Sequence, residues 1–413
     1  MNYLVLNRFA LARRPYRDWI GDNHRIVVIT DTRSIAATEA EKVRRHAGYD
    51  ELVVLDDYQQ NPLVELEALR LHARYRFDEI IALGEFDLLR AARLRQLLGL
   101  PGQSVASAEA FRDKMTMKDH LVASGVPVAP YAAAPSLTSL ARFITEHHYP
   151  VVVKPRRGGG SQGVVVLHDD DGFRSFVART PALGNDDGAP LMVERYLEHQ
   201  LFHVDGIVVD GNPVLVWPSA QEDTSCLDML VGSPLRSCLL DANDPLLEPL
   251  RDMTMRALQA LPTPATSLFH AEIFDTAEHG LVFNEVGCRM GGGRIEEMVA
   301  LGFGTCLPEA YVKALTGVRL PDLPVLPNRI AGLTLFPPRP GHLAAIPDTC
   351  PITGVVDYTV RAEVGTRLRT ARLSVESIAS ALAIGTTRTE VSKVLDDLAE
   401  WFDRETRIEP ATD

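Results

Sequence analysis

The sequence lacks the two best-known nucleotide-binding loops. It contains no Gly-Lys-Ser or Gly-Lys-Thr, the end of a Walker A loop, which argues against a P-loop nucleotide hydrolase. The glycines at 158–163 have the spacing G-x-G-x-x-G, but a β-rich run follows them where a dinucleotide fingerprint would open a helix. A nicotinamide-dependent dehydrogenase is therefore also disfavoured, and nucleotide binding must depend on another arrangement.

Paired cysteines, positive charge and long apolar runs are absent as well. The five cysteines include no C-x-x-C, so we expect reduced thiols of a cytoplasmic protein and neither a disulfide framework nor a zinc site. The formal charge of −13 argues against a nucleic-acid binder. No apolar run reaches membrane-span length, and Met1–Arg8 is interpreted as a first strand instead of a signal peptide. We expect neither nucleic acid nor a membrane as a partner.

A basic, glycine-rich loop between two apolar runs is the most informative feature that is present. Residues 150–153 form a β-rich run that ends at Lys154, the loop follows, and residues 164–166 begin a second β-rich run. Glycine-rich backbone exposes N–H groups that can surround phosphate oxygens, and a lysine adds a positive charge for the same phosphates. The alternative is a hairpin with a flexible, solvated tip, and the loop by itself favours neither reading.

The first hundred residues alternate strand and helix patterns, which predicts a parallel, doubly wound sheet. The expected strands are Tyr3–Leu6, Arg25–Thr30, Glu51–Leu55 and Glu79–Ala82, and the expected helices include Thr38–Arg45, Leu63–Arg74 and a segment near Glu85–Leu98. Downstream we expect one helix over Ser107–Gly125 and a small α/β lobe over 131–195. Mostly β signals then follow, with helices at Pro245–Leu261, Arg294–Leu301 and Thr389–Phe402.

Two glutamates lie on neighbouring strand candidates. Glu272 and Glu285 belong to runs joined by a short polar turn, so an antiparallel hairpin can place them opposite each other. Two such carboxylates in a core need a cation between them, and Mg²⁺ bridged to phosphates is the natural one. Arg289 follows four residues after Glu285 and could bind a carboxylate or phosphate bidentately. The alternative is a solvent-facing pair of glutamates.

In their order and spacing these motifs resemble the ATP-grasp superfamily, specifically its carboxylate–amine ligases such as the L-amino-acid ligases. The resemblance covers nearly the whole chain and implies a mixed α/β and α+β architecture. It predicts an N-terminal Rossmann-like pre-ATP-grasp domain (1–103), a linker helix (104–130), a small ATP-grasp lid subdomain (131–195) and a larger, β-rich C-terminal catalytic subdomain (196–413).

The resemblance also assigns roles to individual residues. Lys114 and Lys154 would bind the phosphates of ATP, and Glu272 and Glu285 would bind Mg²⁺, with Mn²⁺ as an alternative. Arg289, with Lys154, would act in catalysis by steadying the acyl phosphate. The mobile phosphate loop would comprise Gly159, Gly160, Ser161 and Gln162, and the adenine hinge Glu194, Arg195, Tyr196 and Leu197.

The chain departs from the family pattern at three positions. After the hinge, His199 and Leu201 stand where the family usually has a glycine and an acidic residue, which leaves Glu198 and His203 as candidates for the ribose contact. Gly287 stands where the family often has a metal-binding asparagine. The lysines, the glutamates and the arginine are all retained, so we expect a working enzyme.

The resemblance implies an ATP-dependent ligase. It would activate a small carboxylate, such as an amino acid, as an acyl phosphate and couple it to an amine, releasing ADP and phosphate. Two alternatives stay open, loading of an amino acid onto a carrier-protein thiol and non-catalytic nucleotide binding; a homodimer is also open. We expect substrate specificity from the irregular stretch Ser219–Arg236, with His270, Arg294 and Leu333–Phe336 as weaker candidates.

Overall fold

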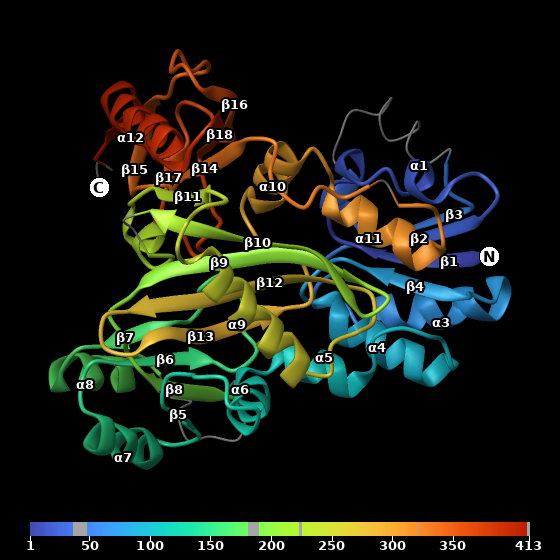
Figure 1. Cartoon of the computed structure of the whole chain (residues 1–413), viewed down its shortest axis with the longest axis horizontal. Helices are drawn as coiled ribbons and strands as arrows, with labels where there is room; N and C mark the ends of the chain where they lie inside the picture. Colours follow the sequence, from blue (N-terminus) through green and yellow to red (C-terminus); the bar gives the residue numbers. More distant parts are fainter. Residues whose placement is uncertain (36–47, 181–189, 223–224, 321, 411–413) are drawn as a thin grey trace.

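Four β-sheets organise the chain. The computed structural model describes residues 1–35, 48–180, 190–222, 225–320 and 322–410. Its sheets are a parallel four-stranded sheet, an antiparallel four-stranded sheet, a large eight-stranded sheet and a small three-stranded sheet. Figure 1 shows the N-terminal sheet at one end of the long axis, with the C-terminal strands of the large sheet and the small four-stranded sheet on opposite sides of its central strands. No described helix is long and apolar enough to cross a membrane.

The N-terminal sheet has the parallel arrangement that the sequence predicts. Its order is β3 (Glu51–Leu55), β2 (Arg25–Asp31), β1 (Asn2–Asn7) and β4 (Glu79–Ala82), and every neighbouring pair is parallel. The helical elements of this region are η1 (Leu11–Arg13), α1 (Tyr16–Ile20), η2 (Thr32–Ile35), α3 (Leu63–Tyr75) and α4 (Asp87–Leu98). The helix expected at Thr38–Arg45 lies outside the described residues. The strand order reverses between β1 and β4, and the crevice beyond their carboxyl ends is where such sheets bind ligands.

The single helix expected over Ser107–Gly125 is wrong. Two helices form instead, α5 (Val105–Arg112) and α6 (Lys114–Ala123), separated by Asp113 in an extended conformation. The Asp113 carboxylate accepts hydrogen bonds from the backbone N–H of Met115 and Thr116, at 3.1 and 3.3 Å, and so caps the second helix. Aspartate competes for backbone donors in this way, which ends one helix and begins the next. As a result Lys114 is the first residue of α6.

The small four-stranded sheet carries the glycine loop. Its antiparallel order is β5 (Tyr131–Ala133), β8 (Leu191–Arg195), β6 (Val151–Pro155) and β7 (Val165–Leu167), with helices α7 (Leu137–His147) and α8 (Asp170–Arg179). The loop joins β6 to β7 as a hairpin, which confirms the two β-rich runs. Gly160 and Gly163 have φ of 63° and 71°, a left-handed conformation that favours glycine.

The large sheet forms the centre of the molecule. Its antiparallel order is β13 (Gly280–Gly287), β12 (Ser267–Thr276), β9 (Gln200–Val209), β10 (Asn212–Glu222), β11 (Leu235–Leu239), β14 (Ile330–Phe336), β18 (Ala379–Gly385) and β16 (Val355–Val360). The accompanying helical elements are η3 (Asp228–Val231), α9 (Leu247–Ala260), α10 (Ile295–Phe303), α11 (Leu307–Thr316) and α12 (Arg388–Glu405). The remaining small sheet pairs β17 (Arg367–Leu368), β15 (Gly341–Ala345) and β19 (Arg407–Glu409).

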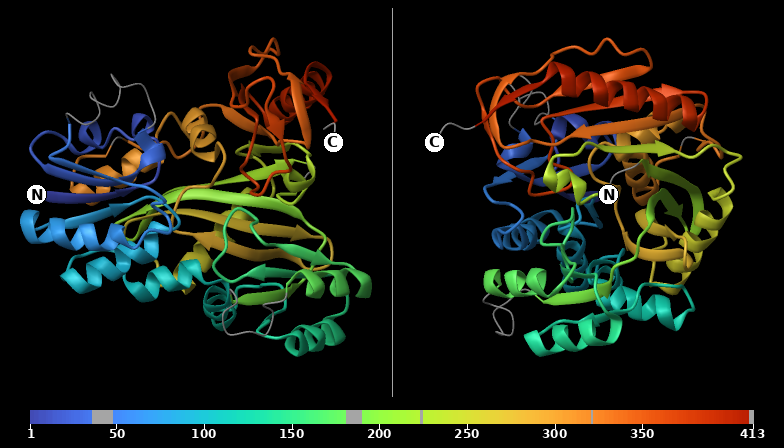
Figure 2. Two further views of the ribbon diagram at one scale, coloured as in Figure 1. Left: turned by 180° about the vertical axis from the view of Figure 1, so that it is seen from behind. Right: turned by 90° about the vertical axis from the view of Figure 1, so that its left-hand side faces the viewer.

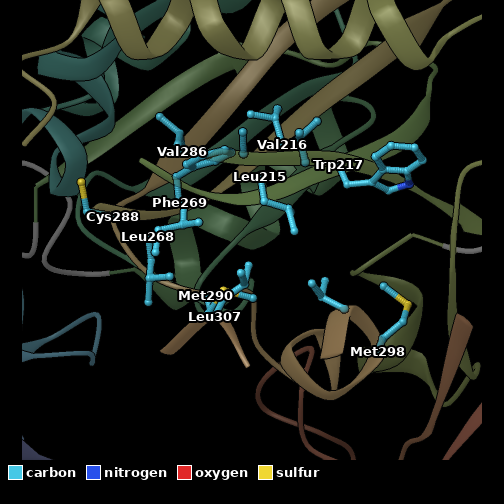
Figure 3. Packing of buried hydrophobic residues seen from close by; sticks show 14 of the residues in the cluster. Leu215, Val216, Trp217, Leu268, Phe269, Val286, Cys288, Met290, Met298 and Leu307 are labelled. Carbon is cyan, nitrogen blue, oxygen red and sulfur yellow. The ribbon is translucent and has the colours of Figure 1, made fainter. Parts of the chain in front are cut away.

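The main hydrophobic core joins the large sheet to these helices. Figure 3 shows part of it, in which strand residues such as Trp217 and Phe269 belong to one cluster with Met298 and Leu307 of α10 and α11.

The predicted irregular stretch Ser219–Arg236 needs correction, because Ser219–Glu222 continues β10 and Leu235–Arg236 begins β11. The expected irregular stretch is therefore shorter at both ends. The views from behind and from the side show β9, β10 and β12 of the large sheet between its C-terminal strands and the small four-stranded sheet (Figure 2). The domain limits themselves stay predictions.

Candidate active site

The two glutamates face each other across the hairpin of β12 and β13. Glu272 and Glu285 are direct register partners, as the sequence predicts. A β-bulge follows, because Ile273 pairs with Phe283 and leaves Asn284 as the extra residue. The Asn284 amide donates to Glu272 at 2.9 Å, and its oxygen accepts from the Lys154 ammonium at 3.4 Å. Asn284 is thus a site residue that the sequence did not reveal, since strand alternation would turn it away from its neighbour Glu285.

Both predicted phosphate lysines are held by carboxylates. The Lys154 ammonium lies 2.9 Å from a Glu194 oxygen, and the Lys114 ammonium lies 3.0 Å from a Glu285 oxygen. Lys114 also donates to the carbonyl oxygen of Gly158 in the glycine loop, at 3.0 Å. Burial by itself would lower the pKa of Lys154, but the charges of Glu194 and Glu285 outweigh it and raise the pKa above its usual value. Lys154 is therefore a cation, and Lys114 contacts the glycine loop directly through Gly158.

Arg289 is oriented by a glutamate from the N-terminal sheet. Its Nε donates to Glu85, which follows β4, and its Nη1 donates to the carbonyl oxygen of Met290 at 2.8 Å. Arg112 binds the other oxygen of Glu85. Burial would raise the pKa of Glu85, yet the charges of Arg289 and Arg112 prevail and hold that pKa at about 2. From the sequence, Glu85 is expected only at the start of a helix. The sequence does not identify its contacts with Arg112 and Arg289, because these residues are far apart in the chain.

A buried histidine network lies beside the two glutamates. Asp205 binds the Nδ1 atoms of His203 and His270, at 2.6 and 2.9 Å. The Nε2 of His203 lies 2.6 Å from the Ser237 hydroxyl, so both ring nitrogens of His203 have protein partners. Burial would lower the pKa of His270, but the charge of Asp205 raises it to about 9. A direct ribose contact by the His203 side chain stays a prediction, and it would require one of these hydrogen bonds to break.

Fourteen predicted site residues line one cavity of about 1180 Å³, whereas Glu198, the other candidate for the ribose contact, does not line it. This volume exceeds the roughly 300–1,000 Å³ of common ligand pockets, which leaves room for more than one bound molecule. The set comprises Lys114, Lys154, Gly159, Gly160, Ser161, Gln162, Glu194, Arg195, Tyr196, Leu197, His203, Glu272, Glu285 and Arg289. Residues that the sequence did not predict also line it, among them Arg8, Glu85 and Asn284.

Arg236, at the end of the candidate stretch, and Arg294, a weaker specificity candidate, take part in ion pairs instead of lining the cavity. Arg236 binds Asp396 of α12, and Arg294 binds Asp357 of β16. His270, Leu333 and Leu335 do line the cavity. Arg236 therefore joins α12 to the large sheet, and Arg294 joins the start of α10 to β16.

The chain is similar in sequence to known ATP-binding domains and amino-acid ligases. Residues 113–219 match the family model described as carbamoyl-phosphate synthase L chain, ATP binding domain. The L-arginine-specific L-amino acid ligase of Bacillus subtilis is 25% identical over 305 residues, which cover 73% of this chain and 72% of that protein. Dapdiamide A synthase of Enterobacter agglomerans is 25% identical over 257 residues, covering 57% of this chain and 58% of that protein.

The solved structures extend this similarity to the whole fold. The crystal structure of L-amino acid ligase from Bacillus licheniformis superposes with a TM-score of 0.77 at 16% identity. The match covers 100% of this chain and 99% of that chain. The ATP-grasp fold expected from the sequence is confirmed, and the matched segment 113–219 contains both lysines and the glycine loop.

Proposed function

We propose that this chain, which is an ATP-dependent carboxylate–amine ligase of the ATP-grasp group, phosphorylates a substrate carboxylate and transfers the acyl group to an amine. The products would be an amide, ADP and phosphate. A carboxylate needs this activation because oxide is a very poor leaving group, whereas phosphate is a good one. The observation that carries the proposal is the meeting of Glu272, Glu285 and two buried lysines with Arg289 in one cavity.

The two lysines and the glycine loop would bind the phosphates of ATP. Lys154 and Lys114 now pair with Glu194 and Glu285, and phosphate oxygens are stronger anionic partners for the same ammonium groups. The charge that accumulates on the transferring phosphoryl group is then met by fixed cations and backbone N–H groups. The hinge residues 194–197 line the same cavity and would contact the adenine mainly through their backbone.

The donor set of the hairpin fits a magnesium ion. Glu272, Glu285 and the amide oxygen of Asn284 offer the oxygen ligands that Mg²⁺ prefers. The two glutamates face each other on adjacent strands, and Asn284 is the bulge residue beside Glu285. Asn284 can supply the amide that Gly287 cannot, because the bulge turns it toward Glu272. When bound, a divalent cation would neutralise charge on the phosphates.

Arg289 would hold the acyl phosphate, and two loops would keep water away from it. The backbone N–H of Ser374, in the C-terminal region, donates to the carbonyl oxygen of Gly160 at 3.1 Å. This hydrogen bond brings the glycine loop against residues 373–374 across the cavity. Exclusion of water matters because water would otherwise hydrolyse the acyl phosphate before the amine attacks.

An amino acid is the acceptor that the cavity favours over a carrier thiol. Arg8 directly follows β1 and lines the cavity at the point where the N-terminal sheet reverses its strand order. Its stem lies against Gly84 and its guanidinium lies over the Phe86 ring, 5.1 Å from the ring centre. Among the described residues Arg8 has no ion-pair or hydrogen-bond partner. The nearby carboxylates Asp31 and Asp87 are already bound by Arg33 and Arg90. A free carboxylate on the acceptor would satisfy this cation.

We therefore expect Arg8→Met to weaken the use of acceptors that carry a carboxylate. Methionine keeps an apolar stem against Gly84 and Phe86 but removes the charge, so kcat/KM for an amino acid should fall roughly ten- to hundredfold. The same amino acid with its carboxyl group converted to an amide should lose little. Steady-state rates with each acceptor measure this, and Arg404→Met, an equivalent change on an exposed arginine of α12 outside the cavity, is the control. Equal losses for acid and amide would contradict the assignment.

Nucleotide product analysis tests the proposed function itself. Purified protein would be incubated with Mg–ATP and pooled amino acids, and ADP, AMP, phosphate and pyrophosphate would be separated. Substrate-dependent release of ADP and phosphate is the expected result. Release of AMP and pyrophosphate would indicate adenylation and overturn the acyl-phosphate mechanism. Division of a productive pool then identifies the two substrates.

A further inference from the structure

Two large apolar side chains are exposed inside the cavity. Val375, on the segment before β18, is 40% exposed, and Val231, at the end of η3, is 76% exposed. Apolar surface is stabilised when it is removed from water, and a bound ligand is what can cover these side chains. They lie outside the set of lysines and carboxylates that would bind ATP.

Three consecutive glycines fix an apolar wall beside Arg289. A Cβ atom on Gly291 would lie 2.5 Å from Ile295, one on Gly292 would lie 2.8 Å from Val375, and one on Gly293 would lie 2.9 Å from Leu335. The backbone of these glycines is thus in close contact with three apolar side chains that line the cavity. Because the glycines follow Met290 in the sequence, the wall begins one residue after the arginine of the reacting centre. We call Met290, Ile295, Leu335 and Val375 the apolar wall.

The carboxylates near this wall already have cationic partners. Glu296, next to Ile295, is bound by Arg14, with one N–O distance of 2.7 Å. Glu376, next to Val375, lies 3.2 Å from the Arg369 guanidinium and accepts from the backbone N–H of Arg372 at 2.9 Å. Among the described residues, neither of these glutamates is free to select a cationic side chain. The wall therefore presents apolar atoms beside two glutamates that are already paired.

We propose that one of the two substrates is an amino acid with a bulky apolar side chain, which packs on the apolar wall. This proposal rests on the proposed ligase function, because it names the substrate class of the same site. Met290 is adjacent to Arg289, and the wall and Arg289 line the same cavity, so a side chain of the acyl donor or of the amine can reach the wall. A substrate with a guanidinium or ammonium side chain would lose its hydration there, because Glu296 and Glu376 are already paired.

A panel of single amino acids tests the proposal. Each would be incubated with Mg–ATP and hydroxylamine, which traps an acyl phosphate as a hydroxamate and releases phosphate, and pairs would be scored for dipeptides by mass spectrometry. Leucine, phenylalanine, methionine or valine should exceed lysine and arginine at least roughly tenfold in kcat/KM, in the donor or the acceptor position. Preference for a charged side chain in both positions would overturn the proposal but leave the ligase function intact. Absence of hydroxamate and of dipeptide from every amino acid would overturn both.

Matched variants locate the preference on the wall. Val375→Asp should lower kcat/KM for the best apolar substrate at least roughly tenfold and raise it for lysine or arginine. Val364→Asp places the same change on a valine that is 61% exposed outside the cavity, and it should leave the preference unchanged. Gly292→Ala adds a Cβ that pushes Val375 into the cavity, so phenylalanine should lose more than alanine does. If Val375→Asp and Gly292→Ala both preserve the wild-type ranking, the wall does not bind a side chain.

Discussion

Glu285→Gln is expected to lower ATP turnover on the order of a thousandfold, the scale of losing one preorganised electrostatic group at a phosphoryl-transfer site. Glu285 faces Glu272, the other proposed magnesium ligand, across the hairpin. It also binds Lys114, a proposed phosphate ligand, at 3.0 Å. Glutamine keeps the size of the side chain but removes the charge that a divalent cation requires. Substrate-dependent ADP release measures the effect.

The fold should survive this change, which makes the loss interpretable. Lys114 retains its hydrogen bond to the carbonyl oxygen of Gly158, and glutamine can accept from Lys114 in place of the carboxylate. The control is Glu278→Gln in the turn of the same hairpin, where the side chain is 70% exposed and lies 3.6 Å from Arg195. Exposed pairs of this kind contribute at most about 1 kcal/mol, so both the Tm and the turnover of the control should match wild type. Normal turnover by the Glu285 variant would refute the metal assignment.

The sequence was sufficient for features that repeat locally. Strand-like patterns of alternating apolar residues predicted the hairpin of β12 and β13. The short polar turn between them allowed Glu272 and Glu285 to be placed opposite each other, and the structure pairs them. The alternation of strand and helix likewise predicted the parallel N-terminal sheet. These features depend on hydrophobic periodicity and short connections, which a single sequence displays directly.

Features that depend on irregular backbone or distant contacts were not predictable in this way. The bulge that aims Asn284 at Glu272 leaves no mark in the strand pattern, because one extra residue on one strand looks like ordinary alternation. Asp113 could have been identified as a helix cap, but the apolar spacing around it also suits one continuous helix. Glu85 binds residues 27 and 204 positions away, a relation that only the folded chain displays.

Arg289→Lys is expected to lower kcat/KM roughly a hundredfold, because a lysine cannot replace a guanidinium that divides its donors between protein and substrate. In the structure Nε binds Glu85 and Nη1 binds the carbonyl oxygen of Met290, which leaves Nη2 without a partner among the described residues and available to the acyl phosphate. A lysine ammonium could bind either the Glu85 carboxylate or the substrate, but it could not bind both in this geometry. Steady-state kinetics with the best substrate pair measure the loss. Arg251→Lys, in an exposed pair on α9, is the control.

Glu85 is then a positioning residue whose effect should depend on Arg289. Its pKa of about 2 means that Glu85→Gln removes a full negative charge at any working pH. We expect a roughly tenfold loss in kcat/KM, since a charged hydrogen bond is weakened while the guanidinium stays in place. If Glu85 acts by orienting Arg289, the double variant should be no worse than Arg289→Lys alone, which is the non-additive outcome for two groups that act as a unit. Additive losses would instead mean that Glu85 contributes to the reaction independently, through Arg112 or by direct contact with a substrate.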